Sequence, residues 1–269
     1  MKAISAFAAL AALISGSAFA ADLPTHKEAP PPPPAPVAVP AFSWTGFYAG
    51  VNAGYAFSQS GDTQTTGTPA FLGFAPTFTP NSLPTNNGGF IGGGQIGYNY
   101  QMGSIVAGVE TDLDFVGQRN SASFTGAVTP LGTSLTTSAT RDLNYLGTLR
   151  GRIGFTPFDR MMLFATGGLA YGGVNTSGSV VANAAPALAW SGSNNQTRAG
   201  WTVGGGAEYA ITNNITLKGE YLFYDLGETS VTALGNAAVQ ATAALNGVYY
   251  TSQARTEGSI LRAGLNFKF

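Results

Sequence analysis

The chain has 269 residues, a formal net charge of −1 and no cysteine, and only 9% of its residues are charged. Without cysteine, a disulfide framework, a lipidated N-terminal cysteine and thiolate chemistry are excluded. The near-neutral charge gives no basic surface for nucleic acid. Typical soluble domains carry roughly 25% charged residues, so this composition indicates that much of the folded surface does not face water.

The N-terminal residues have the organisation of a secretory signal peptide. Met1 and Lys2 precede a short apolar run at 6–14, and a small-residue pattern follows that ends at Ala20. The apolar run is too short to span a membrane as a helix, so we expect cleavage after Ala20. The next feature is the run APPPPPAPVAVP at 29–40, which predicts an extended proline-rich linker without a core.

From Trp44 onward, apolar side chains alternate with polar or small ones at a period of two residues, the pattern of β-strands. In the first segment, 44–57, Phe47 and Val51 fall on one face and Asn52 on the other. The same alternation recurs in seven later segments: 90–100, 105–115, 142–155, 162–171, 199–210, 215–224 and 260–269. The sequence therefore predicts eight strands.

The connections between these segments alternate in length. Three are tight turns of the kind that join hairpins, at 102–104, 156–159 and 212–214. Four are long, rich in Thr, Ser, Asn, Gly and Ala, and are predicted as loops, at 59–88, 118–140, 174–197 and 227–256. Long loops at one end and short turns at the other are typical of an up-and-down barrel in an outer membrane. An even strand count leaves both termini on the short-turn side, which would be periplasmic.

Charged residues of the predicted strands share one face. By alternation this face carries Glu110, Asp112, Asp114, Arg150, Arg152, Glu208, Lys218, Glu220, Arg262 and Lys268. Its remaining positions are mainly Gly, Ala, Thr and Asn, which suits the crowded interior of an eight-stranded barrel, and the apolar face then meets lipid. A soluble lipocalin-like barrel also has eight strands, but its solvated face would be rich in Lys, Glu, Thr and Gln.

We therefore predict a charge network in the lumen, because buried charges are normally paired. Arg150 and Arg152 are expected to pair with Glu110, Asp112 or Asp114 on the neighbouring strand. A similar set is expected on the later strands: Glu208, Glu220, Lys218 and Arg262. An alternative is a cation site at the first three carboxylates. Residues two apart on a strand stand roughly 7 Å apart, so we favour ion pairs and predict no metal site.

Two further patterns suggest chemistry but have simpler explanations. Gly92, Gly94 and Gly97 match the spacing of a dinucleotide-binding loop, yet an alternating strand follows them where that motif needs a helix. Catalysis by a nucleophile activated by histidine would need a histidine in the barrel. The single histidine is His26 in the linker. We therefore predict no catalytic residue and no cofactor.

Several stretches also carry a family resemblance: WTGFYAGVNAGYAF, GGFIGGGQIGYNYQ, LGTLRGRIGF, LFATGGLAYGGV, GWTVGGGAEYAI, ITLKGEYLFYDLG and LRAGLNFKF. They resemble the small outer-membrane porin family of alphaproteobacteria, which includes immunogenic surface proteins. The resemblance covers the predicted strands but not the four long loops. It implies an all-β, OmpA-like fold, an eight-stranded antiparallel up-and-down transmembrane β-barrel, and no catalytic motif. It also implies that the C-terminal strand, ending in Phe267 and Phe269, is read by the barrel-assembly machinery.

The predicted organisation is a signal peptide at 1–20, a periplasmic proline-rich linker at 21–41 and an outer-membrane β-barrel domain at 42–269. The predicted role is structural and surface-presenting in the outer membrane of a Gram-negative bacterium. Its expected partners are outer-membrane lipid, the assembly machinery and a ligand, host or phage partner at the loops. The alternative is a narrow porin-type channel for ions or small solutes.

Overall fold

The computed structural model of the chain describes residues 42–58, 63–67, 82–83, 88–128, 133–183, 188–243 and 245–269. The predicted signal peptide, its cleavage position at Ala20 and the linker at 21–41 lie outside these residues. Among the described residues, no helix is both long and apolar enough to cross a membrane.

Eight long strands dominate the described residues: β1 (Gly46–Ser58), β4 (Gly88–Met102), β5 (Ile105–Val128), β6 (Thr133–Phe158), β7 (Met161–Ala182), β8 (Ala189–Ala210), β9 (Ile215–Gly235) and β10 (Tyr249–Lys268). Three short elements accompany them: β2 (Thr63–Gly67), β3 (Ser82–Leu83) and the helix α2 (Ala237–Ala241). The predicted all-β fold with eight principal strands is confirmed.

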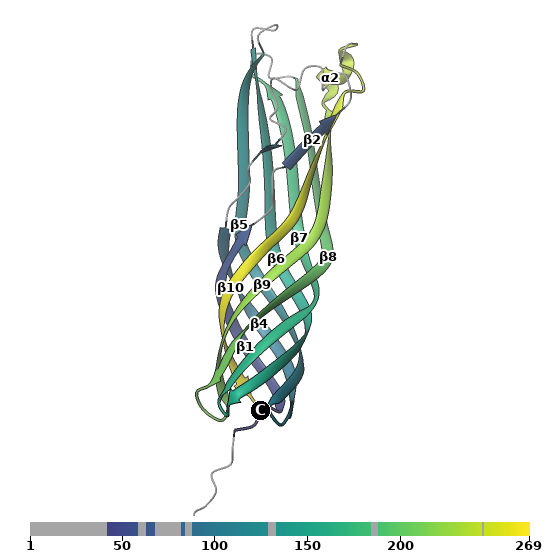
Figure 1. Cartoon of the computed structure of the whole chain (residues 1–269). Helices are drawn as coiled ribbons and strands as arrows, with labels where there is room; N and C mark the ends of the chain where they lie inside the picture. Colours follow the sequence, from purple (N-terminus) through teal and green to yellow (C-terminus); the bar gives the residue numbers. More distant parts are fainter. Residues whose placement is uncertain are drawn as a thin grey trace, which may run out of the picture. The chain divides into compact units, whose positions relative to one another are not determined.

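The eight long strands close into an antiparallel barrel (Figure 1). Each pairs with the next in the chain, and β10 returns to pair with β1, for example Ala53 with Ala263. Closure satisfies the backbone hydrogen-bonding groups along both of these strands, so neither presents an open edge. The tight turn after β4 contains Gly103 with a φ of 63°, a conformation that glycine adopts without steric cost.

Large apolar side chains point outward from the lower part of the barrel. Phe47, Ile96, Val109 and Leu149 are all more than half exposed. Aromatic residues lie at both limits of this apolar belt, with Phe155 and Tyr209 near the short turns and Trp201 further up the strands. Apolar side chains flanked by aromatic girdles are the exterior expected of a membrane-spanning barrel.

The extent of the strands differs from the prediction. Two of the four predicted long loops are largely strand, because β5 runs to Val128, β6 starts at Thr133, β7 ends at Ala182 and β8 begins at Ala189. Figure 1 shows these strands rising well beyond the upper ends of β1 and β4. The prediction of loops at 118–140 and 174–197 was therefore wrong.

The remaining connections also differ in detail. In the fourth predicted loop, 227–256, β9 extends to Gly235 and β10 starts at Tyr249. In the first, β2 pairs with the upper part of β10. The second short turn lies after Phe158 instead of beginning at 156. All of these strand extensions are rich in Thr, Ser and Val, and Thr and Val favour strands when a neighbour supplies the ladder.

One strand changes phase along its length. The alternation predicts Leu143 and Tyr145 on the same outward face of β6, but Leu143 is buried inside. A register shift lies between these two residues where β6 pairs with β7, and another interrupts its pairing with β5. A β-bulge of this kind inserts one unpaired residue and reverses the faces beyond it.

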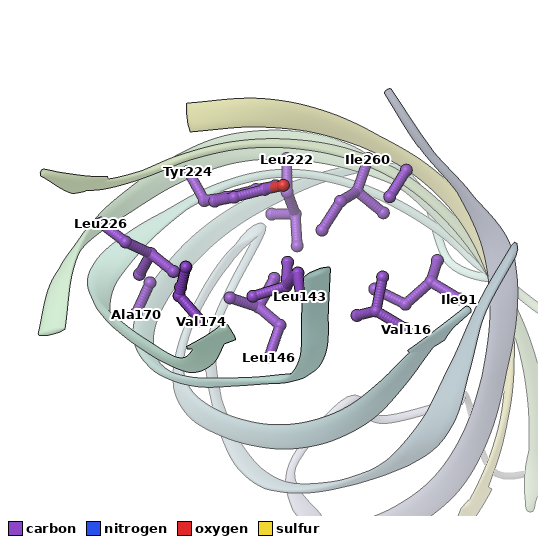
Figure 2. Close-up of a cluster of buried hydrophobic side chains, with 11 residues drawn as sticks. Ile91, Val116, Leu143, Leu146, Ala170, Val174, Leu222, Tyr224, Leu226 and Ile260 are labelled. Carbon is purple, nitrogen blue, oxygen red and sulfur yellow. The ribbon is translucent and has the colours of Figure 1, made fainter. Parts of the chain in front are cut away.

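Side chains fill the barrel interior in layers. A lower apolar layer near the short turns consists of Trp44, Val106, Met162, Phe164 and Ala210. An upper apolar layer consists of Ala56, Ile91, Val116, Leu143, Leu146, Ala170, Val174, Leu222, Tyr224, Leu226 and Ile260 (Figure 2). The order of residues along β5 and β9 puts the charged side chains between these two layers.

Candidate functional site

Nine of the ten predicted lumen residues lie inside the barrel, each no more than 5% exposed. They are Glu110, Asp112, Asp114, Arg150, Arg152, Glu208, Lys218, Glu220 and Arg262. We call this set the charge network. Alternation brings them inward from β5, β6, β8, β9 and β10, and the closed barrel directs all of them toward one axis.

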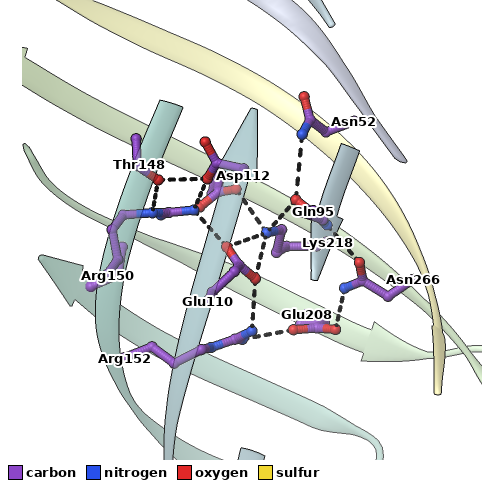
Figure 3. Close-up of polar contacts among 12 residues, drawn as sticks. Asn52, Gln95, Glu110, Asp112, Thr148, Arg150, Arg152, Glu208, Lys218 and Asn266 are labelled. Atoms are coloured by element: carbon purple, nitrogen blue, oxygen red, sulfur yellow. Dashed lines mark hydrogen bonds and ion pairs between the residues drawn. The ribbon is translucent and has the colours of Figure 1, made fainter. Parts of the chain in front are cut away.

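Arg150 contacts Thr148, Asp112 and Glu110 (Figure 3). Its Nη2 lies 2.5 Å from Glu110 Oε1 and 2.7 Å from Asp112 Oδ2 on β5. Its Nη1 lies 2.9 Å from Glu220 Oε2 on β9, across the lumen. Its Nε donates to Thr148 Oγ1 at 2.9 Å. One guanidinium therefore connects carboxylates from opposite walls.

Arg152 extends the network toward the short turns. Its Nη2 lies 2.7 Å from Glu208 Oε2 and its Nη1 lies 3.3 Å from Glu110 Oε2. The same Nη1 donates to the Tyr48 hydroxyl at 2.9 Å. Its guanidinium also stacks 4.3 Å from the ring centroid of Phe164 in the lower apolar layer. A planar guanidinium suits this combination of ion pairs and ring contact.

Lys218 and Arg262 join the remaining carboxylates. Lys218 Nζ lies 2.9 Å from Glu110 Oε1 and 2.9 Å from Glu220 Oε1. Arg262 lies 2.8 Å from Asp112 through Nη2 and 2.9 Å from Glu220 through Nε, and it also pairs with Asp114. The two sets expected from the sequence are therefore one connected network. Glu110 pairs with cationic side chains of β6 and β9, and Glu220 pairs with those of β6, β9 and β10.

Neutral polar side chains that the sequence prediction did not include complete the network. Lys218 Nζ donates to Gln95 Oε1 at 2.9 Å, and Asn266 Nδ2 donates to Glu208 Oε1 at 2.8 Å. The Tyr48 hydroxyl donates to Glu110 Oε2 at 2.7 Å. Gln95 and Tyr48 fall on the inward face by simple alternation, so the same signal that found the charges could have found them.

Lys268 is the exception among the predicted lumen residues. Its ammonium donates to the backbone oxygen of Ser43 and lies 5.0 Å from the ring centroid of Phe42. It belongs to the barrel mouth because it is the last residue of β10. The predicted balance of five acids against five bases is corrected to five acids against four bases in the charge network.

Most of the carboxylate oxygens are engaged by arginine and lysine. Glu208 Oε1 instead accepts from Thr216 and Asn266, and Asp112 Oδ1 and Asp114 Oδ1 are buried without a hydrogen-bond partner among the described residues. In the part of the chain that the structure describes, no group of three or more acidic or histidine side chains is arranged to hold a metal ion. The arrangement is therefore one of mutual charge neutralisation.

The predicted assembly residues lie outside the barrel. Phe267 is 50% exposed and Phe269 is 74% exposed. Their rings meet edge to face with centroids 5.3 Å apart. They lie at the end of the barrel that carries the short turns, where a lower aromatic girdle would sit.

Comparison with known proteins agrees with this architecture. The family described as outer membrane protein beta-barrel domain matches residues 6–251. The chain is 36% identical over 275 residues to the 31 kDa outer-membrane immunogenic protein of Brucella melitensis biotype 1, covering 97% of this chain and 98% of that protein. It is 33% identical over 190 residues to the 22 kDa outer membrane protein of Rhizobium leguminosarum bv. viciae, covering 69% and 66%.

Among solved structures, the outer membrane protein OprG from Pseudomonas aeruginosa is similar, with a TM-score of 0.47 and 12% identity over 84% of this chain and 97% of that one. The sequence matches span nearly the whole chain, and the resemblance noted from its strand segments is confirmed. The chain belongs to the outer membrane protein β-barrel domain family. It is an outer-membrane β-barrel protein, homologous to an immunogenic outer-membrane protein of Brucella and to an outer membrane protein of Rhizobium.

Proposed function

We propose that this protein is a closed, non-conducting barrel with a structural and surface-presenting role in the outer membrane. The observation that carries the proposal is the filled lumen. The charge network crosses the interior from β5 to β9, and apolar layers lie above and below it. An ion crossing the barrel would have to break buried ion pairs, and removing one partner of such a pair costs about 3–5 kcal/mol.

We also propose that the short-turn end, with both barrel termini, faces the periplasm, and that the C-terminal strand is the part read by the assembly machinery. The taller end, with β5 to β8, then faces the exterior and presents side chains to a host, phage or ligand. The names of the relatives, which describe immunogenic outer-membrane proteins, support surface exposure. The proposal includes no catalytic step, because the only histidine of the chain is His26.

Single-channel recording on the refolded full chain in planar bilayers tests the closed lumen. We expect no stable conductance steps from the wild-type protein. A balanced double variant, Glu110→Ala/Arg150→Ala, removes one charge of each sign from the centre of the lumen and serves as the matched positive control. Conductance that appears only in this variant supports a plugged barrel. Regular steps from the wild type would overturn the proposal in favour of a narrow porin-type channel.

A further inference from the structure

The outer wall of the tall part of the barrel carries hydroxyl side chains in register across four strands. One row runs through Ser123, Ser138, Ser179 and Ser191 on β5 to β8. A second row, nearer the membrane, runs through Ser121, Thr140, Ser177 and Ser193. We call these two rows the hydroxyl wall. All of them point away from the barrel interior, because the intervening residues Ala139 and Gly178 fill the inward positions.

The hydroxyl wall lies above the lipid-facing surface, on the same outward side of the strands. Along β7 it follows Tyr171, and along β6 and β8 it precedes Tyr145 and Trp201, so the aromatic residues separate it from the apolar belt. Ser138 and Tyr145 are seven residues apart, roughly 23 Å at about 3.3 Å per residue along a strand. A bilayer is about 40–45 Å thick with its headgroups and about 30 Å without them, so the wall lies beyond the headgroup layer. It can meet only those parts of the surrounding lipids that extend outward from the headgroups.

A shallow hollow lies in this wall. It has a volume of about 420 Å³ and is lined by hydroxyl side chains together with Gly178 and Gly192. Within the described residues, no side-chain hydrogen bond uses the hydroxyls of either row. Each hydroxyl can both donate and accept, so the wall offers a regular set of available donors and acceptors about 4.7–4.9 Å apart between strands.

The residue types of the hydroxyl wall indicate which kind of ligand it can bind. Neither row contains a charged or aromatic residue, so the wall lacks the cations that hold phosphate and the apolar area that holds acyl chains. On the opposite side, β9 and β10 carry ion pairs from Arg255 to Asp225 and Glu257. A neutral, polyhydroxylated chain is the ligand that hydroxyl groups alone can match.

We propose that the hydroxyl wall binds the uncharged saccharide chain of lipopolysaccharide in the surrounding leaflet. This inference rests on the proposed function in one respect, that the tall end faces the exterior. A laterally directed wall above the lipid belt meets the carbohydrate of neighbouring lipids, so the saccharide chain is held along the barrel side by many weak hydrogen bonds.

Binding measurements on the refolded full chain in detergent test this proposal. The probes are lipopolysaccharide with a long uncharged polysaccharide, lipopolysaccharide truncated before that chain, and the released polysaccharide. We expect the wild type to bind the long form roughly tenfold more tightly than the truncated form, a difference of about 1.4 kcal/mol. The variant Ser138→Ala/Ser179→Ala/Ser191→Ala should lose most of this difference, and the released polysaccharide should compete.

The matched control is Ser230→Ala/Thr232→Ala/Gln253→Ala, which changes exposed outward positions of β9 and β10 at a similar height. It should keep the wild-type preference, and heat-modified gel mobility verifies that each variant is folded. Equal affinity of the wild type for both lipopolysaccharides, or an equal loss in the control, overturns the proposal. A change from dimer to monomer in the wall variant with unaltered binding would instead identify a second copy as the occupant. These results are independent of conductance, so a failure here is distinct from a failure of the closed-barrel proposal.

Discussion

At the scale of single residues, Arg150 is the side chain on which the lumen depends most. It contacts carboxylates from two strands that are not neighbours in the sheet, and its side chain has no exposed area. A buried cation with several partners is costly to remove, because the five buried carboxylates of the charge network would then face only three buried cations.

We expect Arg150→Ala to lower the free energy of unfolding by about 3–5 kcal/mol. The matched control is Val109→Ala, since Val109 lies on the adjacent strand but points outward and is 57% exposed. Denaturant unfolding of both refolded variants in detergent measures the difference. If both substitutions had the same effect, the lumen would be hydrated and its charges screened.

The sequence alone was sufficient to predict which residues of the charge network point inward and that Arg150 and Arg152 pair with carboxylates of β5, but not the pairs that cross the lumen. Alternation assigns a face to Glu110 and Arg150, and their adjacency on β5 and β6 follows from the up-and-down order of the strands. The pair between Arg150 and Glu220 crosses the lumen, and it depends on barrel closure and strand tilt, which no local pattern encodes. Lys268 was wrongly assigned to the charge network. Alternation places it on the inward face of β10, but it lies at the end of that strand, beyond the charged layer.

At the scale of elements, strand existence was predictable and strand length was not. In the membrane belt, large apolar residues alternate with small or charged ones, and this contrast marks the strand cores. Above the belt, both faces carry small or polar residues, as with Ser177, Gly178 and Ser179 on β7. With no contrast between the faces, this part has the composition of a loop, although neighbouring strands hold it in a continuous ladder.

The C-terminal strand β10 gives a prediction about assembly. Phe269 is 74% exposed, so its burial contributes only part of the roughly 1.5–3 kcal/mol of a fully buried phenylalanine. We therefore expect Phe269→Ser to refold in detergent into a heat-modifiable, strand-rich barrel. In cells, the same variant should leave little protein in the outer membrane.

Membrane fractionation with quantitative immunoblotting measures this second result. The variant Phe158→Ser is the matched control, because Phe158 is 70% exposed at the same end of the barrel but precedes the turn between β6 and β7. Normal outer-membrane levels of Phe269→Ser, or equal depletion of both variants, would mean that the terminal phenylalanine only contributes to the aromatic girdle.

At the scale of the whole molecule, the two ends of the barrel differ in a way that labelling can detect. The chain contains no cysteine, so each introduced cysteine is a unique probe. Ser104 is exposed in the turn after β4, and Asn246 is exposed in the segment between α2 and β10. In intact cells, a membrane-impermeant maleimide should label Asn246→Cys and leave Ser104→Cys unlabelled until the outer membrane is permeabilised. The reverse pattern would invert the proposed orientation.

The tall part of the barrel wall, formed by β5 to β8, also determines what an antibody could recognise. Where β5 to β8 continue as paired strands, side chains that are adjacent on the surface come from different strands, such as Ser138, Ser179 and Ser191. An epitope on this wall is therefore discontinuous, and it disappears when heating in a denaturing detergent separates the strands. Linear peptides copied from 118–140 or 174–197 would reproduce at most one edge of it. A vaccine or diagnostic based on this region would need the folded barrel.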